Sequence, residues 1–120
     1  MAKRVLLAED DPNIVVSLSF VLERAGYAVV SHANGKDVLA SVLSDPPDVM
    51  ILDVMLPDKN GLEILEAMRA SDTAAHVPVL VLTAKGRRLD QDAAMSSGAN
   101  IFMKKPFSNA EILAAVARLA

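Results

Sequence analysis

The chain has 120 residues, of which 12 are Lys or Arg and 15 are Asp or Glu, giving a net charge of −3. This length predicts one domain, since domains hold roughly 100–200 residues, and 52% hydrophobic residues are enough for one core. The lack of cysteine excludes disulfides, iron–sulfur clusters, thiolate zinc sites and cysteine nucleophiles. An acidic chain with 3% aromatic residues is also poorly suited to nucleic acid, which needs a basic face and stacking rings.

Neither a membrane-spanning segment nor an export signal is expected. The longest apolar run, residues 112–117, is far shorter than the ~20 residues that cross a bilayer. The first four residues are basic in character, but the apolar run that follows is too short for a signal peptide and leads directly into acids. We therefore expect a cytoplasmic protein that has no membrane partner.

Short apolar runs alternate along the chain with segments of helical periodicity. The apolar runs, each expected to be a strand, are residues 5–8, 28–30, 49–52, 79–82 and 101–103. The helical segments between and after them are residues 12–25, 38–43, 62–68, 87–97 and 108–119. Pro12 suits a first helical turn, and Gly26 and Gly98 each follow a helical segment. Ser108 and Glu111 form a capping box at the start of the last one.

Five strand–helix repeats predict an α/β fold, a doubly wound parallel sheet with helices on both faces. Most of the apolar runs are continuous rather than alternating, which is typical of strands that are covered on both faces. Five strands suit the flavodoxin-like order 2-1-3-4-5. Ligands of such sheets bind at the carboxyl ends of the strands, where the order reverses between strands 1 and 3.

Polar side chains stand at this edge, directly or shortly after four of the runs: Glu9, Asp10, Asp11, Asp53, Thr83 and Lys105. Gathering acids is costly, because two carboxylates ~4 Å apart repel by about 4 kcal/mol at an effective dielectric near 20. Oxygen ligands without nearby His or Cys suit a hard cation, and a few carboxylates with waters suit Mg²⁺. Asp11 is expected only to cap the helix that follows it.

Each of the other residues has a structural interpretation beside a chemical one. Asp53 follows a buried run, and is either a turn residue or a nucleophile held at a rigid position. Thr83 is a good strand former whose hydroxyl gains meaning only beside Asp53. Lys105 precedes Pro106, and a cis bond there would aim the lysine at the acids or at a phosphoryl group attached to them.

Several short motifs occur in order along nearly the whole chain: Val5-Leu6-Leu7-Ala8-Glu9-Asp10-Asp11, Leu52-Asp53-Val54-Met55-Leu56-Pro57, Asn60-Gly61, Leu82-Thr83-Ala84, Gly98-Ala99 and Lys105-Pro106-Phe107. With this set, the chain closely resembles the receiver domain of two-component response regulators. The resemblance implies a single receiver domain over residues 1–120. One departure, Asp58-Lys59-Asn60, is expected to alter the loop after Asp53 but not the chemistry.

The resemblance also implies a role for each site residue. Asp53 would be the phospho-acceptor, and Mg²⁺ would be held by Asp10, Asp53 and the carbonyl of Met55, with Glu9 acting mainly through water. Thr83 and Lys105 would contact the phosphoryl group. Phe102 occupies the position of the family's switch aromatic, although a plain core residue is the alternative.

The implied partners are a sensor histidine kinase or histidine phosphotransfer protein as donor, and a downstream output domain or protein as target. Phosphorylation would reshape the face formed by the fourth helix, the fifth strand and the fifth helix. The domain would be a self-assisting phospho-acceptor switch rather than a conventional enzyme. Met55 and Lys85, at positions that tune hydrolysis in the family, offer no carboxamide or carboxylate and predict a slowly hydrolysing phosphoryl group.

A mainly monomeric state is expected, with at most weak dimerisation after phosphorylation. Arg87 and Glu111 have the signs to pair across a two-fold axis, and Arg118 is also present. Other charges of the family's dimer network are replaced, at Ser97, Asn100, Ile101 and Ala115. Exposed ion pairs contribute ~0–1 kcal/mol each, so the losses should outweigh the one pair that remains.

Three rival functions are weaker. A phosphatase of the haloacid dehalogenase type needs a second aspartate two residues after the nucleophile, where this chain has Met55. A flavodoxin-like cofactor binder needs a phosphate loop after the first strand, where this chain has acids. An adaptor that is not phosphorylated would not need the complete set of acids, threonine and lysine.

Overall fold

The computed structural model describes residues 2–84 and 86–120 of the chain. Strands and helices alternate throughout: β1 (Arg4–Ala8), α1 (Pro12–Arg24), β2 (Ala28–His32), α2 (Gly35–Ser44), β3 (Val49–Asp53), α3 (Gly61–Arg69), β4 (Val79–Thr83), α4 (Arg88–Ser97), β5 (Ile101–Lys104) and α5 (Asn109–Leu119). All strand pairs are parallel, and the sheet order is β2-β1-β3-β4-β5. The predicted flavodoxin-like order is therefore confirmed.

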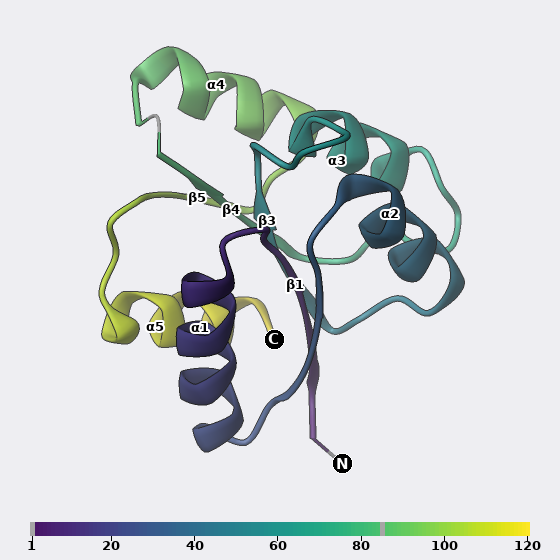
Figure 1. Ribbon diagram of the computed structural model, residues 1–120. Coiled ribbons are helices and arrows are strands. Elements are labelled where there is room, and N and C mark those ends of the chain that lie inside the picture. Colours follow the sequence, from purple (N-terminus) through teal and green to yellow (C-terminus); the bar gives the residue numbers. More distant parts are fainter. Residues whose placement is uncertain (1, 85) are drawn as a thin grey trace.

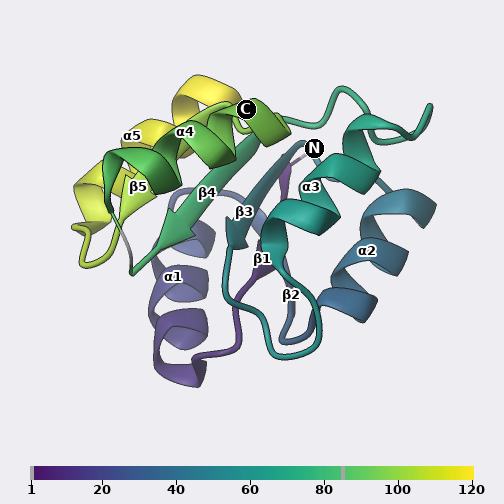
Figure 2. The same ribbon diagram turned by 90° about the horizontal axis from the view of Figure 1, so that it is seen from above.

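Helices cover both faces of the sheet, α1 and α5 on one side and α2, α3 and α4 on the other (Figures 1 and 2). Successive strand residues point to opposite faces. Val5 and Leu7 therefore pack under α1 and α5, while Leu6 and Ala8 pack under α2 and α3. This double covering explains why the central strands have continuous apolar sequences.

The three central strands are buried along nearly their whole length, whereas the edge strands β2 and β5 are partly exposed. The covering on both faces that most of the apolar runs predict is therefore confirmed for the central strands, and the flanking helices leave the two edge strands partly uncovered. β3, β4 and β5 also run one residue beyond their apolar runs, to Asp53, Thr83 and Lys104. The ladder continues through these polar residues, with Asp53 opposite Leu82 and Thr83 opposite Lys104.

The helix ends follow the expected local signals in most cases. Asp11 caps α1 by accepting a hydrogen bond from the Asn13 amide at 2.9 Å, and the predicted capping box starts α5. Gly98 ends α4 in the left-handed conformation, with φ of 113°. One detail is corrected: Arg87 lies just before α4 in extended backbone and not within the helix.

Arg69, at the end of α3, fastens the C-terminal end of α4 to the rest of the domain. Its guanidinium donates to the Gly98 carbonyl at 3.1 and 2.8 Å and to Asn100 Oδ1 at 3.1 Å. It also donates to the carbonyls of Ala75 and Val77, at 3.1 and 2.7 Å. These bonds hold the α4–β5 turn and the α3–β4 connection against one side chain.

No helix in residues 2–84 and 86–120 is both long and apolar enough to cross a bilayer.

Candidate functional site

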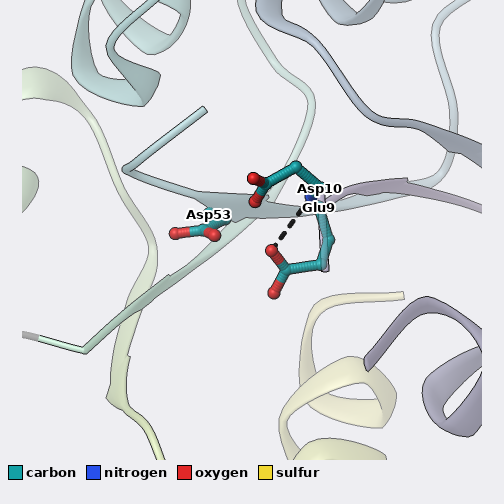
Figure 3. Close-up of side chains that lie close together, drawn as sticks. All are labelled: Glu9, Asp10 and Asp53. Atoms are coloured by element: carbon teal, nitrogen blue, oxygen red, sulfur yellow. Dashed lines mark hydrogen bonds between the residues drawn. The ribbon is translucent and has the colours of Figure 1, made fainter. Parts of the chain in front are cut away.

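An acidic cluster lies where β1 and β3 end, at the edge that the sheet order predicts. Glu9 and Asp10 follow β1 directly and Asp53 is the last residue of β3. One carboxylate oxygen from each residue lies within 4.8 Å of the others (Figure 3). Glu9 and Asp53 are buried, with 1% and 5% of their surface exposed, while Asp10 is exposed.

Lys105 connects the two buried acids. Its Nζ donates to Glu9 Oε1 at 2.7 Å and to Asp53 Oδ2 at 3.2 Å. Its backbone amide donates to the Thr83 carbonyl at 2.8 Å, and its peptide bond to Pro106 is cis. Burial alone would lower the pKa of Lys105, but the hydrogen bond to Glu9 and the charges of both acids raise it above its usual value. The lysine therefore stays charged within the cluster.

The surroundings of Glu9 favour its protonated form. Burial raises the pKa of Glu9 from 4.5 to about 7, helped by the neighbouring Asp53 carboxyl and opposed by Lys105. Its other oxygen, Oε2, accepts from the Asp10 amide at 3.0 Å (Figure 3). Its own amide donates to the His32 carbonyl at 3.2 Å, at the end of β2. The side chain is thus fixed in a position where negative charge is costly.

The donor set suits a divalent cation. Three carboxylates face one ammonium, so the cluster carries excess negative charge when the acids are ionised. All of the acidic ligands are oxygens, as Mg²⁺ prefers, and no thiol or imidazole is among them. Asp10 and Asp53 would hold such an ion, and the exposure of Asp10 leaves room for its waters.

The backbone after Asp53 folds back over the acid. The Met55 amide donates to Asp53 Oδ1 at 3.1 Å, and the Gly61 amide donates to the Val54 carbonyl at 2.7 Å. A Cβ atom on Gly61 would lie 2.7 Å from the Asp53 carbonyl oxygen, so only glycine fits there. Asn60 then caps α3 through the Leu62 amide at 2.7 Å. Asn60-Gly61 is therefore a packing requirement as well as a motif.

Thr83 and Phe102 line a cavity of about 220 Å³ beside the acid cluster, between β4, β5, α3 and α4. Its other walls come from residues of the β3–α3 segment and of α4: Val54, Met55, Asn60, Leu62, Asp90 and Ala93. Thr83 is buried, whereas Phe102 is half-buried and packs against the core under α2 and α3. The Phe102 ring is therefore partly exposed to solvent and borders the cavity.

The structure brings together most of the residues that the sequence singles out. Glu9, Asp10, Asp53 and Lys105 form one cluster, and Thr83 adjoins it through the Lys105 amide. Met55 contacts Asp53 through its backbone amide. Met55 itself is 57% exposed. The prediction of slow hydrolysis also involves Lys85, which lies outside the described part of the chain.

Sequence reasoning did not anticipate the role of Asp58. Its carboxylate accepts hydrogen bonds from the Gly35 amide at 2.5 Å and the Lys36 amide at 3.1 Å. The Gly35 hydrogen bond is the main reason that the pKa of Asp58 is lowered. The residues are more than 20 positions apart in the sequence, so no local pattern could have revealed the contact.

Fold and site together define a doubly wound α/β domain with a lysine-paired acidic site at the switch point of its sheet. Residues 5–117 match the family described as the response regulator receiver domain. PhoP of Bacillus subtilis (strain 168), the alkaline phosphatase synthesis transcriptional regulatory protein, is 37% identical over 116 residues. That match covers 97% of this chain and 48% of PhoP. The transcriptional regulatory protein TrcR of Mycobacterium tuberculosis (strain ATCC 25618 / H37Rv) is 40% identical, over 92% of this chain and 42% of TrcR.

Solved structures agree over almost the whole chain. The chemotaxis response regulator CheY4 of Vibrio cholerae is 29% identical with a TM-score of 0.93, covering 100% of both chains. The receiver domain of the sensor histidine kinase PA1611 from Pseudomonas aeruginosa PAO1 is 28% identical with a TM-score of 0.91, covering 99% of this chain and 98% of that one. That structure holds a magnesium ion in its active-site cleft.

The chain therefore belongs to the receiver domain family of two-component response regulators. It spans about half the length of the transcriptional regulators that it matches.

The raised pKa of Glu9 predicts that stability without metal falls as pH rises. Above 4.5 the unfolded chain releases the Glu9 proton, while the folded protein keeps it until about 7. The free energy of unfolding should therefore fall by about 1–3 kcal/mol across this range and stay low above it. Urea denaturation with a chelator at several pH values measures the change.

Two variants make this measurement specific. Glu9→Gln should lose the pH dependence, whereas Glu23→Gln, which changes an exposed glutamate on α1, should keep it. Equal pH dependence in wild type and Glu9→Gln would contradict the assignment.

Proposed function

We propose that this domain is a Mg²⁺-dependent phospho-acceptor switch and that Asp53 is its acceptor. The observation that carries the proposal is the position of Asp53, buried at a strand end between two further acids and hydrogen-bonded by Lys105 and the Met55 amide. A carboxylate held this rigidly beside excess negative charge is suited to chemistry that a cation makes possible. Membership in the receiver family supports the same function.

The proposed transfer step makes use of this geometry. A carboxylate oxygen of Asp53 attacks the phosphorus of a phosphohistidine in line. The new O–P bond forms as the P–N bond breaks, and the electron pair of that bond returns to the donor imidazole. Such transfers depend mainly on positioning and on neutralisation of charge. Lys105, already 3.2 Å from Asp53, is placed to pair with an oxygen of the incoming phosphoryl group.

A divalent cation would be held by Asp10 and Asp53, with the Met55 carbonyl as a further ligand and Glu9 acting through water. When bound, it supplies the positive charge that the phosphoryl oxygens need. The residues of this chain do the rest: Glu9 holds Lys105 in place, and the Met55 amide holds Asp53.

The readout uses the cavity beside Thr83. The Thr83 hydroxyl would move toward a phosphoryl oxygen. The ring of Phe102 would then rotate into the space that Thr83 leaves in the cavity. The domain must already sample both arrangements, since phosphorylation can only shift their balance. The surface that changes is the face of α4, β5 and α5, which would contact an output domain or protein.

The proposed partners are a histidine kinase or histidine phosphotransfer protein as donor and an output domain or protein as target, all in the cytoplasm. Residues 1–120 act in this scheme as one receiver domain that binds no nucleic acid itself. It assists its own phosphorylation and dephosphorylation, but it is not a conventional enzyme.

Asp53→Asn should abolish phosphate incorporation from acetyl phosphate in the presence of Mg²⁺, because the amide is a poor nucleophile. Incorporation is measured by intact-protein mass spectrometry. Asp11→Asn is the matched control, because it changes a neighbouring aspartate that only caps α1 and should retain incorporation. Asp10→Ala should instead raise the Mg²⁺ concentration that is needed. Undiminished incorporation in Asp53→Asn would refute the acceptor assignment.

The phosphoryl group on Asp53 should hydrolyse slowly compared with that of chemotaxis-type receivers. Met55 is exposed beside the acceptor and its side chain offers no group that could orient an attacking water. Loss of the phosphorylated mass with time, after removal of the donor, measures the lifetime. A half-life of seconds or less in the isolated domain would show that the prediction is wrong, and Met55→Asn should shorten it.

The unphosphorylated domain should be mainly monomeric. Arg87 is paired with Asp90 of its own chain at 3.1 Å, and Glu111 is held in the capping box of α5. Ala115 is buried in the core and offers no charge to a partner. Sedimentation should show a monomer without beryllofluoride and at most weak association with it. A tight dimer in both states would overturn this expectation.

A further inference from the structure

The loop between β3 and α3 is attached to a helix that has no part in the acid cluster. Asp58, five residues after the acceptor, accepts hydrogen bonds from the first two amides of α2, those of Gly35 and Lys36. The third amide of α2, that of Asp37, donates separately to Asn34 Oδ1 at 2.9 Å. The start of α2 is therefore capped by two side chains from different parts of the chain.

The contact between the loop and α2 is close as well as polar. A Cβ atom on Gly35 would lie 2.5 Å from the Cβ of Lys59 and 3.1 Å from Ile64 Cδ1. The backbones can approach this far only because residue 35 is glycine. Together with the two hydrogen bonds to Asp58, this packing fixes the outer end of the loop.

The inner end of the same loop contacts the acceptor. Met55 donates to Asp53 Oδ1, and Met55 pairs with Asn60 in an antiparallel bridge. Residues 55–60 thus form a small closed turn with one side on Asp53 and the other on α2. A shift at Asp58 must be transmitted to Met55, since only Leu56 and Pro57 separate them.

We propose that Asp58 is a positioning residue, which holds the loop on α2 so that the Met55 backbone stays in place over Asp53 and the cation site. The inference rests on the proposed function, since it concerns the affinity of that site for Mg²⁺. Charge supports it: the carboxylate of Asp58 lies at the positive end of the α2 dipole, where an anion is stabilised. Asp58 itself is not among the clustered acids, so its effect would be indirect.

A simple capping role is the alternative, and Asn34→Ala is the control for it. Asn34→Ala removes an acceptor from the same helix end but leaves the loop attached, whereas Asp58→Ala removes both the acceptor and the attachment. Asp58→Asn, which keeps one acceptor oxygen, should be intermediate. Asp58 is exposed, so these changes leave the core intact.

Two readouts separate positioning from stability. Hydrogen exchange of the Met55 amide, measured without metal, should be faster in Asp58→Ala than in wild type and unchanged in Asn34→Ala. Mg²⁺ titration followed by backbone amide NMR should show affinity reduced about tenfold in Asp58→Ala, as is typical when a supporting residue is lost. The affinity of Asn34→Ala should stay within about twofold of wild type.

The outcomes are distinct. Equal effects of Asp58→Ala and Asn34→Ala on exchange and affinity would overturn the positioning role and leave a cap only. Normal Met55 exchange in Asp58→Ala would also overturn it, whatever happens to Mg²⁺. Faster exchange with no Mg²⁺ binding by wild type would instead refute the proposed cation site and leave the attachment itself intact.

Discussion

The ion pairs of Lys105 with two buried carboxylates are the interaction on which the site depends. A buried acid without a partner is strongly destabilising, and Glu9 and Asp53 are both almost fully buried. The compensating charge comes from beyond β5, on the far side of β4 from Asp53. The ion pairs can therefore form only when β1, β3, β4 and β5 are already assembled in order. Fold and site depend on each other. The sheet brings the acids together, and the Lys105 charge offsets the cost of burying them.

The positive charge of Lys105 does not balance the negative charge of the three acids. This excess negative charge makes the cluster suited to a cation. One ammonium faces three carboxylates, so a cation or a proton is needed to balance the remainder. Burial raises the pKa of Glu9 to about 7, so Glu9 binds a proton below that pH. A divalent cation bound by the cluster, as proposed above, would therefore compete with protons for it as the pH falls toward 7. A neutral core residue in place of Glu9 would cost less free energy to bury, but it would not bind the Lys105 ammonium.

The sequence was enough to predict the sheet order and the acid cluster, because parallel strands bring their carboxyl ends to one edge. It predicted Thr83 as a strand end but did not predict that Asp53 belongs to its strand, since an acidic residue after an apolar run is typical of a loop. It also missed Asp58 and Arg69, whose partners depend on how loops are packed over 20 or more positions. Local patterns determine elements, whereas contacts between loops depend on the assembled fold.

Arg69 gives α4 two unequal ends. Its guanidinium holds the Gly98 carbonyl and Asn100, so the C-terminal end of α4 is fixed to α3. The N-terminal end begins without a side-chain cap and borders the cavity through Asp90 and Ala93. Because the attachment lies at one end, a small rotation of α4 about Gly98 would displace its first turn the most. Leu89 is exposed in that first turn, so a rotation of this kind would carry an apolar side chain across the surface.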